Sequence, residues 1–166
     1  IWAAGGGNRA LHWIDMINYE KLRKTPKLLI GFSDVTALIN AVYGHTGIET
    51  FHGATFNRLY KCPQKQQHLE LLSDARIIYP AEDMIALRRG SAQGHLIGGN
   101  LSIVQYLAPA LSRNYHKDGI LFLEDCNEEL SRIDRMLLHL RRSGIFHSIS
   151  GLIFGQFGDT PDTGKP

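Results

Sequence analysis

Short apolar runs alternate with segments of helical period along this chain, and this alternation limits the fold more than any other feature. Strands are expected at residues 1–4, 27–32, 48–51, 76–79, 94–97, 120–123 and 152–155. Between them, apolar residues recur every three or four positions, most clearly at Leu130, Ile133, Met136, Leu137 and Leu140. This order is typical of β-α-β units, so the sequence predicts an α/β fold with mainly parallel sheets.

Glycine and proline set the expected helix ends. Pro26 ends a predicted helix, or set of helical turns, that carries Leu11 to Leu22. Gly44 and Gly47 end a predicted helix that opens at Ser33-Asp34, and Pro109 ends one over 101–107. Gly98-Gly99-Asn100 is predicted to be a tight turn. The continuous apolar run 120–123 predicts a strand buried on both faces.

The pattern weakens between Tyr60 and Arg89, which predicts a domain boundary. The expected division is an N-terminal α/β domain at 1–80, a linker at 81–93 and a C-terminal α/β domain at 94–166. The chain opens on what reads as the end of a buried strand and stops in the polar loop 158–166, so a fragment lacking its first strands and its C-terminal end is expected.

Composition excludes several classes of protein. Lys and Arg number 18 against 16 Asp and Glu, a net charge of +2, and the longest basic clusters are two Arg pairs, which argues against nucleic-acid binding. No apolar run approaches the roughly 18 residues of a membrane span. Cys62 and Cys126 lack C-x-x-C spacing and are expected to be reduced thiols in a cytoplasmic protein. The eight histidines form no zinc-binding pair, so no metal site is predicted.

The junction Gly31-Phe32-Ser33-Asp34 is the most informative candidate for chemistry. A serine between a strand and a helix is raised on a sharp turn, beside free amides such as that of Asp34, which can hold a developing oxyanion. The alternative is that Ser33 or Asp34 only caps the helix. From the residues alone both interpretations stay open.

Three further segments carry candidate residues. The loop Gly5-Gly6-Gly7-Asn8 either adds a backbone donor or is a plain turn, and Gly99-Asn100 either faces a substrate or only turns the chain. Glu124 ends a buried strand, where open α/β sheets place their ligands, and it can orient a histidine. Alternatively, Asp125 caps a helix and Glu124 is solvated. His52 is expected to be satisfied by backbone hydrogen bonds.

These segments together resemble one family, the LD-carboxypeptidases. It comprises serine peptidases that include muramoyl-tetrapeptide carboxypeptidase and the microcin C self-immunity peptidases. The resemblance covers nearly the whole chain and rests on the order of Gly5-Gly6, Asp15, Pro26-Lys27, Gly31–Leu38, Thr50–Gly53, Gly98–Leu101, Leu121–Asp125 and Asp134–Leu137.

The resemblance implies an active site between two α/β domains. Ser33 would be the nucleophile, Glu124 the triad acid, and the amides of Asp34 and Gly6 the oxyanion donors, with the catalytic histidine lying beyond Pro166. Gly99 and Asn100 would bind substrate. The resemblance implies no metal and no cofactor. It does imply a homodimer.

The implied reaction is release of the terminal D-alanine from a murein tetrapeptide during peptidoglycan recycling. Two alternatives remain. One is an immunity-type serine peptidase that cleaves a peptidyl-nucleotide antibiotic, which Ile97 disfavours because many members carry Trp there. The other is a non-catalytic peptide-binding protein of the same fold. Neither nucleic acid nor membrane is an expected partner.

Overall fold

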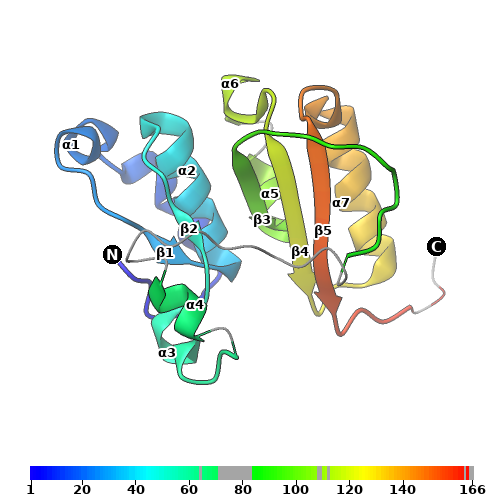
Figure 1. Ribbon diagram of the computed structural model, residues 1–166, viewed down its shortest axis with the longest axis horizontal. Helices are drawn as coiled ribbons and strands as arrows, with labels where there is room; N and C mark the ends of the chain where they lie inside the picture. Colours follow the sequence, from blue (N-terminus) through cyan, green and yellow to red (C-terminus); the bar gives the residue numbers. More distant parts are fainter. Residues whose placement is uncertain (64, 71–83, 108–109, 112, 163, 165–166) are drawn as a thin grey trace.

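The structure, a computed structural model, describes residues 1–63, 65–70, 84–107, 110–111, 113–162 and 164. The predicted strand at 76–79 lies outside these residues. Two parallel sheets lie side by side (Figure 1). In the first, β1 (Ile30–Gly31) pairs with β2 (Phe51–His52), and Trp2 bridges to Ile30. The second has the order β3 (Leu96–Asn100), β4 (Ile120–Cys126), β5 (Gly151–Gly158). The predicted α/β class with parallel sheets is confirmed.

Helices follow the strands in alternation. The α-helices are α1 (Tyr19–Lys24), α2 (Thr36–Thr46), α3 (Phe56–Leu59), α4 (Lys65–Glu70), α5 (Leu101–Leu107), α6 (Arg113–His116) and α7 (Leu130–Arg142). The 3-10 helices are η1 (Ala10–His12), η2 (Ile14–Met16), η3 (Ser33–Val35) and η6 (Ile145–His147). Gly47, at φ 73°, ends α2 as predicted.

Between Leu11 and Leu22, where a helix or helical turns are expected, the structure has helical turns. The segment divides into η1, η2 and the short α1, because Ile17 is extended and Asn18 starts a new helix. The Asn18 side chain accepts a hydrogen bond of 2.9 Å from the Lys21 amide. Such a cap fixes a helix start that apolar spacing alone does not show.

The predicted turn at Gly98-Gly99-Asn100 is wrong, because these residues continue β3. Gly98 and Gly99 have φ values of 108° and 129°, which other residues rarely adopt. A Cβ atom on Gly98 would lie 2.1 Å from the carbonyl oxygen of Phe122. The two glycines therefore let neighbouring backbones approach closely instead of reversing the chain.

Helices α5 and α7 cover one face of the second sheet, behind it in Figure 1. Leu121 and Leu123 of β4 are fully buried there, against Leu101 and Leu140. The intervening Phe122 and Glu124 point to the other face and are half-buried. Burial of 120–123 on both faces is therefore wrong, since β4 presents one face to the core and the other to the first sheet.

Hydrogen bonds tie α2 to β3 and so join the two sheets. The Asn40 amide donates to the carbonyl of Gly98 at 2.8 Å, and the Gly98 N–H donates to Asn40 Oδ1 at 3.0 Å. The Asn100 N–H donates to Thr36 Oγ1 at 3.2 Å, and the buried Tyr115 hydroxyl also donates to Asn40. Because α2 follows Ser33 and β3 pairs with β4, which carries Glu124, these bonds fix the position of Ser33 relative to Glu124.

Candidate active site

Ser33 lies on a sharp bend between β1 and the helical segment η3–α2. Its φ of 61° is left-handed, in contrast to the extended Phe32 before it. A serine costs about 1 to 3 kcal/mol in such a conformation, and strained turns of this kind raise nucleophiles above a sheet. No side chain caps η3 or α2, so the helix-capping interpretation of Ser33 and Asp34 is wrong.

One glycine makes this bend possible, and a second lies close to it. A Cβ atom on Gly31 would lie 2.5 Å from Val35 Cγ1, so only glycine fits under the turn. A Cβ atom on Gly6 would lie 3.5 Å from Ser33 Oγ, which places the backbone of the glycine loop against the serine hydroxyl. The structure thus brings together Ser33 and Gly6, which the sequence placed in one site.

The Asp34 carboxylate holds the glycine loop in place. Its Oδ2 accepts hydrogen bonds of 3.0 Å from the amides of both Arg9 and Ala10, and Asp34 itself is only 9% exposed. The Asp34 amide lies in the first helical turn, where N–H groups lack intrahelical acceptors. Sequence reasoning assigned a role to this amide and missed the role of the carboxylate.

Glu124 lies near the carboxyl end of β4, on the face toward the first sheet. The pairing of β4 with β5 shifts here, since Leu123 pairs with Phe154 but Asp125 pairs with Phe157. Such β-bulges bend a strand and re-aim a side chain. A Cβ atom on Gly155, in the bulge, would lie 3.2 Å from the Glu124 Cβ, so glycine leaves room for Glu124.

Burial raises the pKa of Glu124 from 4.5 to about 7, and the negative charge of Asp125 adds to the rise while the Asn100 amide opposes it. The side chain is 19% exposed and its Oε1 is buried without a hydrogen bond among the described residues. The interpretation of Glu124 as a solvated residue is therefore wrong. A carboxyl group with this pKa changes charge in the neutral range.

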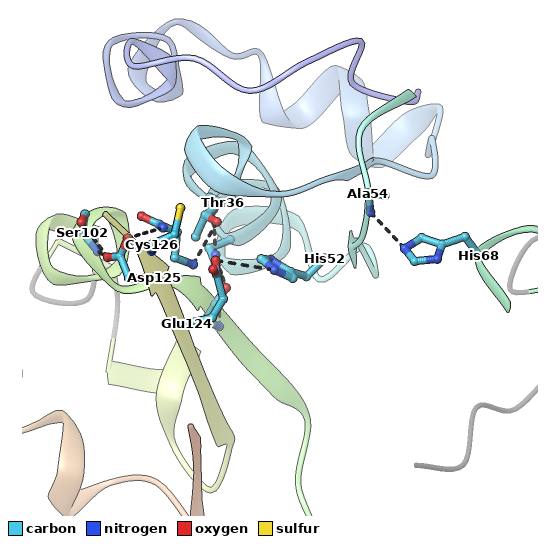
Figure 2. Close-up of polar contacts among 11 residues, drawn as sticks. Thr36, His52, Ala54, His68, Ser102, Glu124, Asp125 and Cys126 are labelled. Carbon is cyan, nitrogen blue, oxygen red and sulfur yellow. Dashed lines mark hydrogen bonds and ion pairs between the residues drawn. The ribbon is translucent and has the colours of Figure 1, made fainter. Parts of the chain in front are cut away.

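Asp125 anchors the start of α5 (Figure 2). Its carboxylate accepts hydrogen bonds from the Ser102 amide at 2.9 Å, the Ser102 hydroxyl at 2.7 Å and the Asn100 side chain at 2.9 Å. Asp125 thus caps α5, the helix that follows β3. The alternative drawn from the sequence was that Asp125 caps a helix following β4. The Cys126 N–H also donates to the Asp125 carboxylate at 2.9 Å, so four donors hold the negative charge beside Glu124 in place.

Gly99 and Asn100 lie within the contact between the two sheets. Asn100 is 8% exposed, with one amide hydrogen committed to Asp125. A Cβ atom on Gly99 would lie 2.9 Å from both Thr36 Oγ1 and His52 Nδ1. These packing contacts leave substrate binding by the two residues a prediction. Ile97 is 4% exposed in the core, so its identity is no argument about substrate.

The environment of His52 differs from expectation. Its Nδ1 is buried without a hydrogen bond among the described residues, and its Nε2 lies 3.8 Å from Glu124 Oε1 (Figure 2). Burial lowers the His52 pKa to about 4. The contact is therefore one between a neutral imidazole and a carboxyl group. Sequence reasoning missed this pair because His52 and Glu124 lie 72 positions apart in the chain.

A cleft of about 930 Å³ is lined in part by Phe32, the residue before Ser33. Residues from both sheets line it, including Phe32, His52, Arg58, Lys61, His68 and Gln156. Arg58 lies over the Phe32 ring, with its guanidinium carbon 5.9 Å from the ring centre. The cleft thus combines apolar surface with two cations, Arg58 and Lys61, and Phe32 in its lining directly precedes the candidate nucleophile.

No group of three or more His, Cys, Asp or Glu side chains that could hold a metal ion occurs among the described residues. Cys62 and Cys126 are not joined in a disulfide. Within the described ranges, none of the helices has the length and apolar character needed to cross a membrane.

Comparison with known proteins matches residues 1–53 to the LD-carboxypeptidase N-terminal domain and residues 93–165 to the LD-carboxypeptidase C-terminal domain. The "Probable murein peptide carboxypeptidase" of Bacillus subtilis is 32% identical over 151 residues, covering 85% of this chain and 46% of that protein. The microcin C7 self-immunity protein MccF of Escherichia coli is 24% identical over 195 residues, covering 94% and 55%.

The fold is shared with solved structures. The crystal structure of muramoyltetrapeptide carboxypeptidase from Oxalobacter formigenes has a TM-score of 0.79 and 27% identity, covering 96% of this chain and 56% of that one. The chain spans about half the length of the curated relatives it matches. On the two domain matches, the chain belongs to the LD-carboxypeptidase family.

Proposed function

We propose that this chain carries the nucleophile and the triad acid of a serine LD-carboxypeptidase. Ser33 Oγ attacks the carbonyl carbon of the terminal peptide bond while a histidine takes the hydroxyl proton. The amides of Asp34 and Gly6 stabilise the oxyanion, and the histidine then gives its proton to the leaving amine. Water hydrolyses the acyl-enzyme by the same path. Glu124 orients the histidine, which the family resemblance puts beyond Pro166.

The observation that carries this proposal is the bend at Ser33. A serine held at a φ of 61°, with the backbone of Gly6 against its hydroxyl and first-turn amides beside it, is the arrangement that acyl transfer requires. Backbone strain of this kind is concentrated at functional sites. Glu124, on the neighbouring sheet, supplies a half-buried carboxyl group able to stabilise an imidazolium.

The substrate we propose is a murein tetrapeptide that loses its terminal D-alanine. A carboxypeptidase must recognise a free carboxylate, and Arg58 and Lys61 bring two cations to the cleft. Relatives named as murein peptide and muramoyltetrapeptide carboxypeptidases support this substrate class. We also propose that the reaction takes place in the cytoplasm, as part of peptidoglycan recycling.

The test is D-alanine release from murein tetrapeptide by the intact protein. Ser33→Ala is expected to reduce kcat by a factor of about 10⁴ or more, while Ser91→Ala, at an exposed serine outside the cleft, leaves it unchanged. Equal release by Ser33→Ala and the parent would remove the assignment. Substrate binding without release by the parent would favour a non-catalytic peptide-binding protein.

A second candidate is cleavage of a peptidyl-nucleotide antibiotic. The likeness to the self-immunity protein MccF favours it, and Ile97 no longer counts against it because this residue lies in the core. Comparing kcat/KM for murein tetrapeptide and for an aminoacyl-adenylate mimic separates the two candidates. We expect the tetrapeptide to have the higher value.

Two other expectations stay predictions. The domain division at 1–80, 81–93 and 94–166 is one, and residues 84–95 contain no helix or strand, as a linker would. The homodimer is the other, and the oligomeric state of the intact protein in solution tests it.

A further inference from the structure

We propose that His52 is a positioning residue for Glu124, donating its Nε2–H to the Glu124 carboxylate and holding that side chain toward the triad histidine. The inference rests on the proposed role of Glu124 as triad acid. It adds a partner on the first sheet, so the acid is supported by the same sheet that carries the nucleophile. His52 would act on the reaction through Glu124 and would not take the proton of Ser33.

The two side chains point toward each other from different sheets (Figure 2). His52 belongs to β2 and Glu124 to β4, and the Nε2–Oε1 distance of 3.8 Å is within 1 Å of a hydrogen bond. Hydrogen bonds in active sites are often long before substrate binds and shorten in the complex. Oε1 has no hydrogen bond among the described residues, so it has an unfilled acceptor position for this donor.

The imidazole ring is held by aromatic and backbone contacts. Phe32 and Phe122 meet it edge to face, with ring centres 6.4 and 5.5 Å away. Gly99 closes a third side, where even a Cβ atom would lie 2.9 Å from Nδ1. The side chain is 24% exposed. A ring held in this way can fix the direction of a donor aimed at Glu124.

The surroundings also select the tautomer. Nδ1 is buried beside Gly99 without a hydrogen bond among the described residues, and an N–H group buried there would lack an acceptor. Nε2 faces a carboxylate oxygen, so the proton is favoured on Nε2. The lone pair of His52 then faces Gly99, which argues against His52 as the base that takes the Ser33 proton.

The charges around the pair agree with this role. Burial lowers the His52 pKa to about 4, so the ring is a neutral donor throughout the neutral range. Burial and Asp125 raise the Glu124 pKa to about 7. The neighbouring strands β3 and β5 present the Asn100 amide and the Gly155 backbone to Glu124. A donor at His52 favours the ionised carboxylate, which opposes the rise that Asp125 and burial cause.

The experiment compares His52→Leu with His52→Gln in the intact protein, using the pH dependence of kcat on murein tetrapeptide. Leu fills the apolar site without a donor, whereas the Gln amide places an N–H near the position of Nε2. We expect His52→Leu to lower kcat about tenfold at pH 7 and to move the acid limb up by about one pH unit. His52→Gln should restore both toward the parent values.

If the acid limb of the kcat profile is unchanged in His52→Leu, the proposal is overturned. It is also overturned if His52→Gln has no higher kcat than His52→Leu although the two variants have equal urea midpoints. Loss of more than about 10³ in kcat with both variants would make His52 the base. Long-range ¹H–¹⁵N NMR correlations of the parent report the tautomer without any activity. A proton on Nδ1 would refute the positioning role even if the protein had no peptidase activity, and a proton on Nε2 would support it in that case.

Discussion

The Asp34 carboxylate provides the sharpest test of how the glycine loop is held beside Ser33. A single oxygen, Oδ2, accepts hydrogen bonds of 3.0 Å from the amides of Arg9 and Ala10, while Oδ1 is buried without a partner among the described residues. Asp34→Leu removes the acceptor while keeping a side chain branched at Cγ. Asp34→Asn can keep an oxygen in the position of Oδ2 while it loses the charge and places an NH2 group at Oδ1, so the two substitutions separate loss of the acceptor from loss of the charge.

The magnitude follows from the two bonds. A hydrogen bond to a charged acceptor contributes about 1.5 to 3 kcal/mol, and a buried amide left without a partner costs about 1 to 3 kcal/mol. Because both amides share one oxygen, the lower values apply. The free energy of unfolding should fall by about 3 kcal/mol in Asp34→Leu and by about 1 kcal/mol in Asp34→Asn.

Urea unfolding measures these changes, and kcat for D-alanine release measures the effect on the loop. If Gly6 donates to the oxyanion, its displacement in Asp34→Leu should cost about 10²-fold or more in kcat, with a much smaller loss in Asp34→Asn. Equal stability of the Leu variant and the parent would refute the role of the carboxylate in holding the loop. A Leu variant with the parent kcat would instead show that the loop does not serve the oxyanion.

Two other substitutions test the site. Gly31→Ala should lower the free energy of unfolding by about 1 to 3 kcal/mol in urea, because its Cβ would lie 2.5 Å from Val35 Cγ1, whereas Gly90→Ala, with open space around it, should be neutral. Folding raises the Glu124 pKa from 4.5 to about 7, so the stability this group contributes is complete below pH 4.5 and lost as pH rises through 7. Glu124→Gln, always neutral, should therefore gain stability over the parent between about pH 5 and pH 8 while losing peptidase activity. If the urea midpoints of Glu124→Gln and the parent differ by the same amount at pH 5 and at pH 8, the raised pKa is contradicted.

Local patterns predicted those features of the chain that depend on neighbours in sequence. The strands around Ile30 and Leu121, the helix α7 and the placement of Ser33 between a strand and a helix all follow from apolar spacing and from glycine. Gly98 and Gly99 were assigned to a turn because the same residue type serves turns and close backbone approach. Only the position of the Phe122 carbonyl distinguishes the two uses.

The features that sequence reasoning missed join residues far apart in the chain. The contact of His52 with Glu124 and the hydrogen bonds of Asp34 to Arg9 and Ala10 have no signature in local spacing. Each depends on which residues the fold brings together, and a buried polar atom is understood only when its partner is known. For the same reason, the raised pKa of Glu124 could not be predicted from the sequence.

The placement of the two proposed catalytic groups depends on how α2 is attached to β3. Thr36, three residues after Ser33, accepts a hydrogen bond from the backbone N–H of Asn100. Asn100 is paired with Glu124 in the register of β3 and β4. One turn further along α2, Asn40 pairs with both backbone groups of Gly98. Moving one sheet past the other would leave these buried groups without partners, at a cost of about 1 to 3 kcal/mol for each. The bend at Ser33 and the bulge at Glu124 are therefore held at a fixed separation by polar groups in the interior, which is what a catalytic site assembled from two sheets requires.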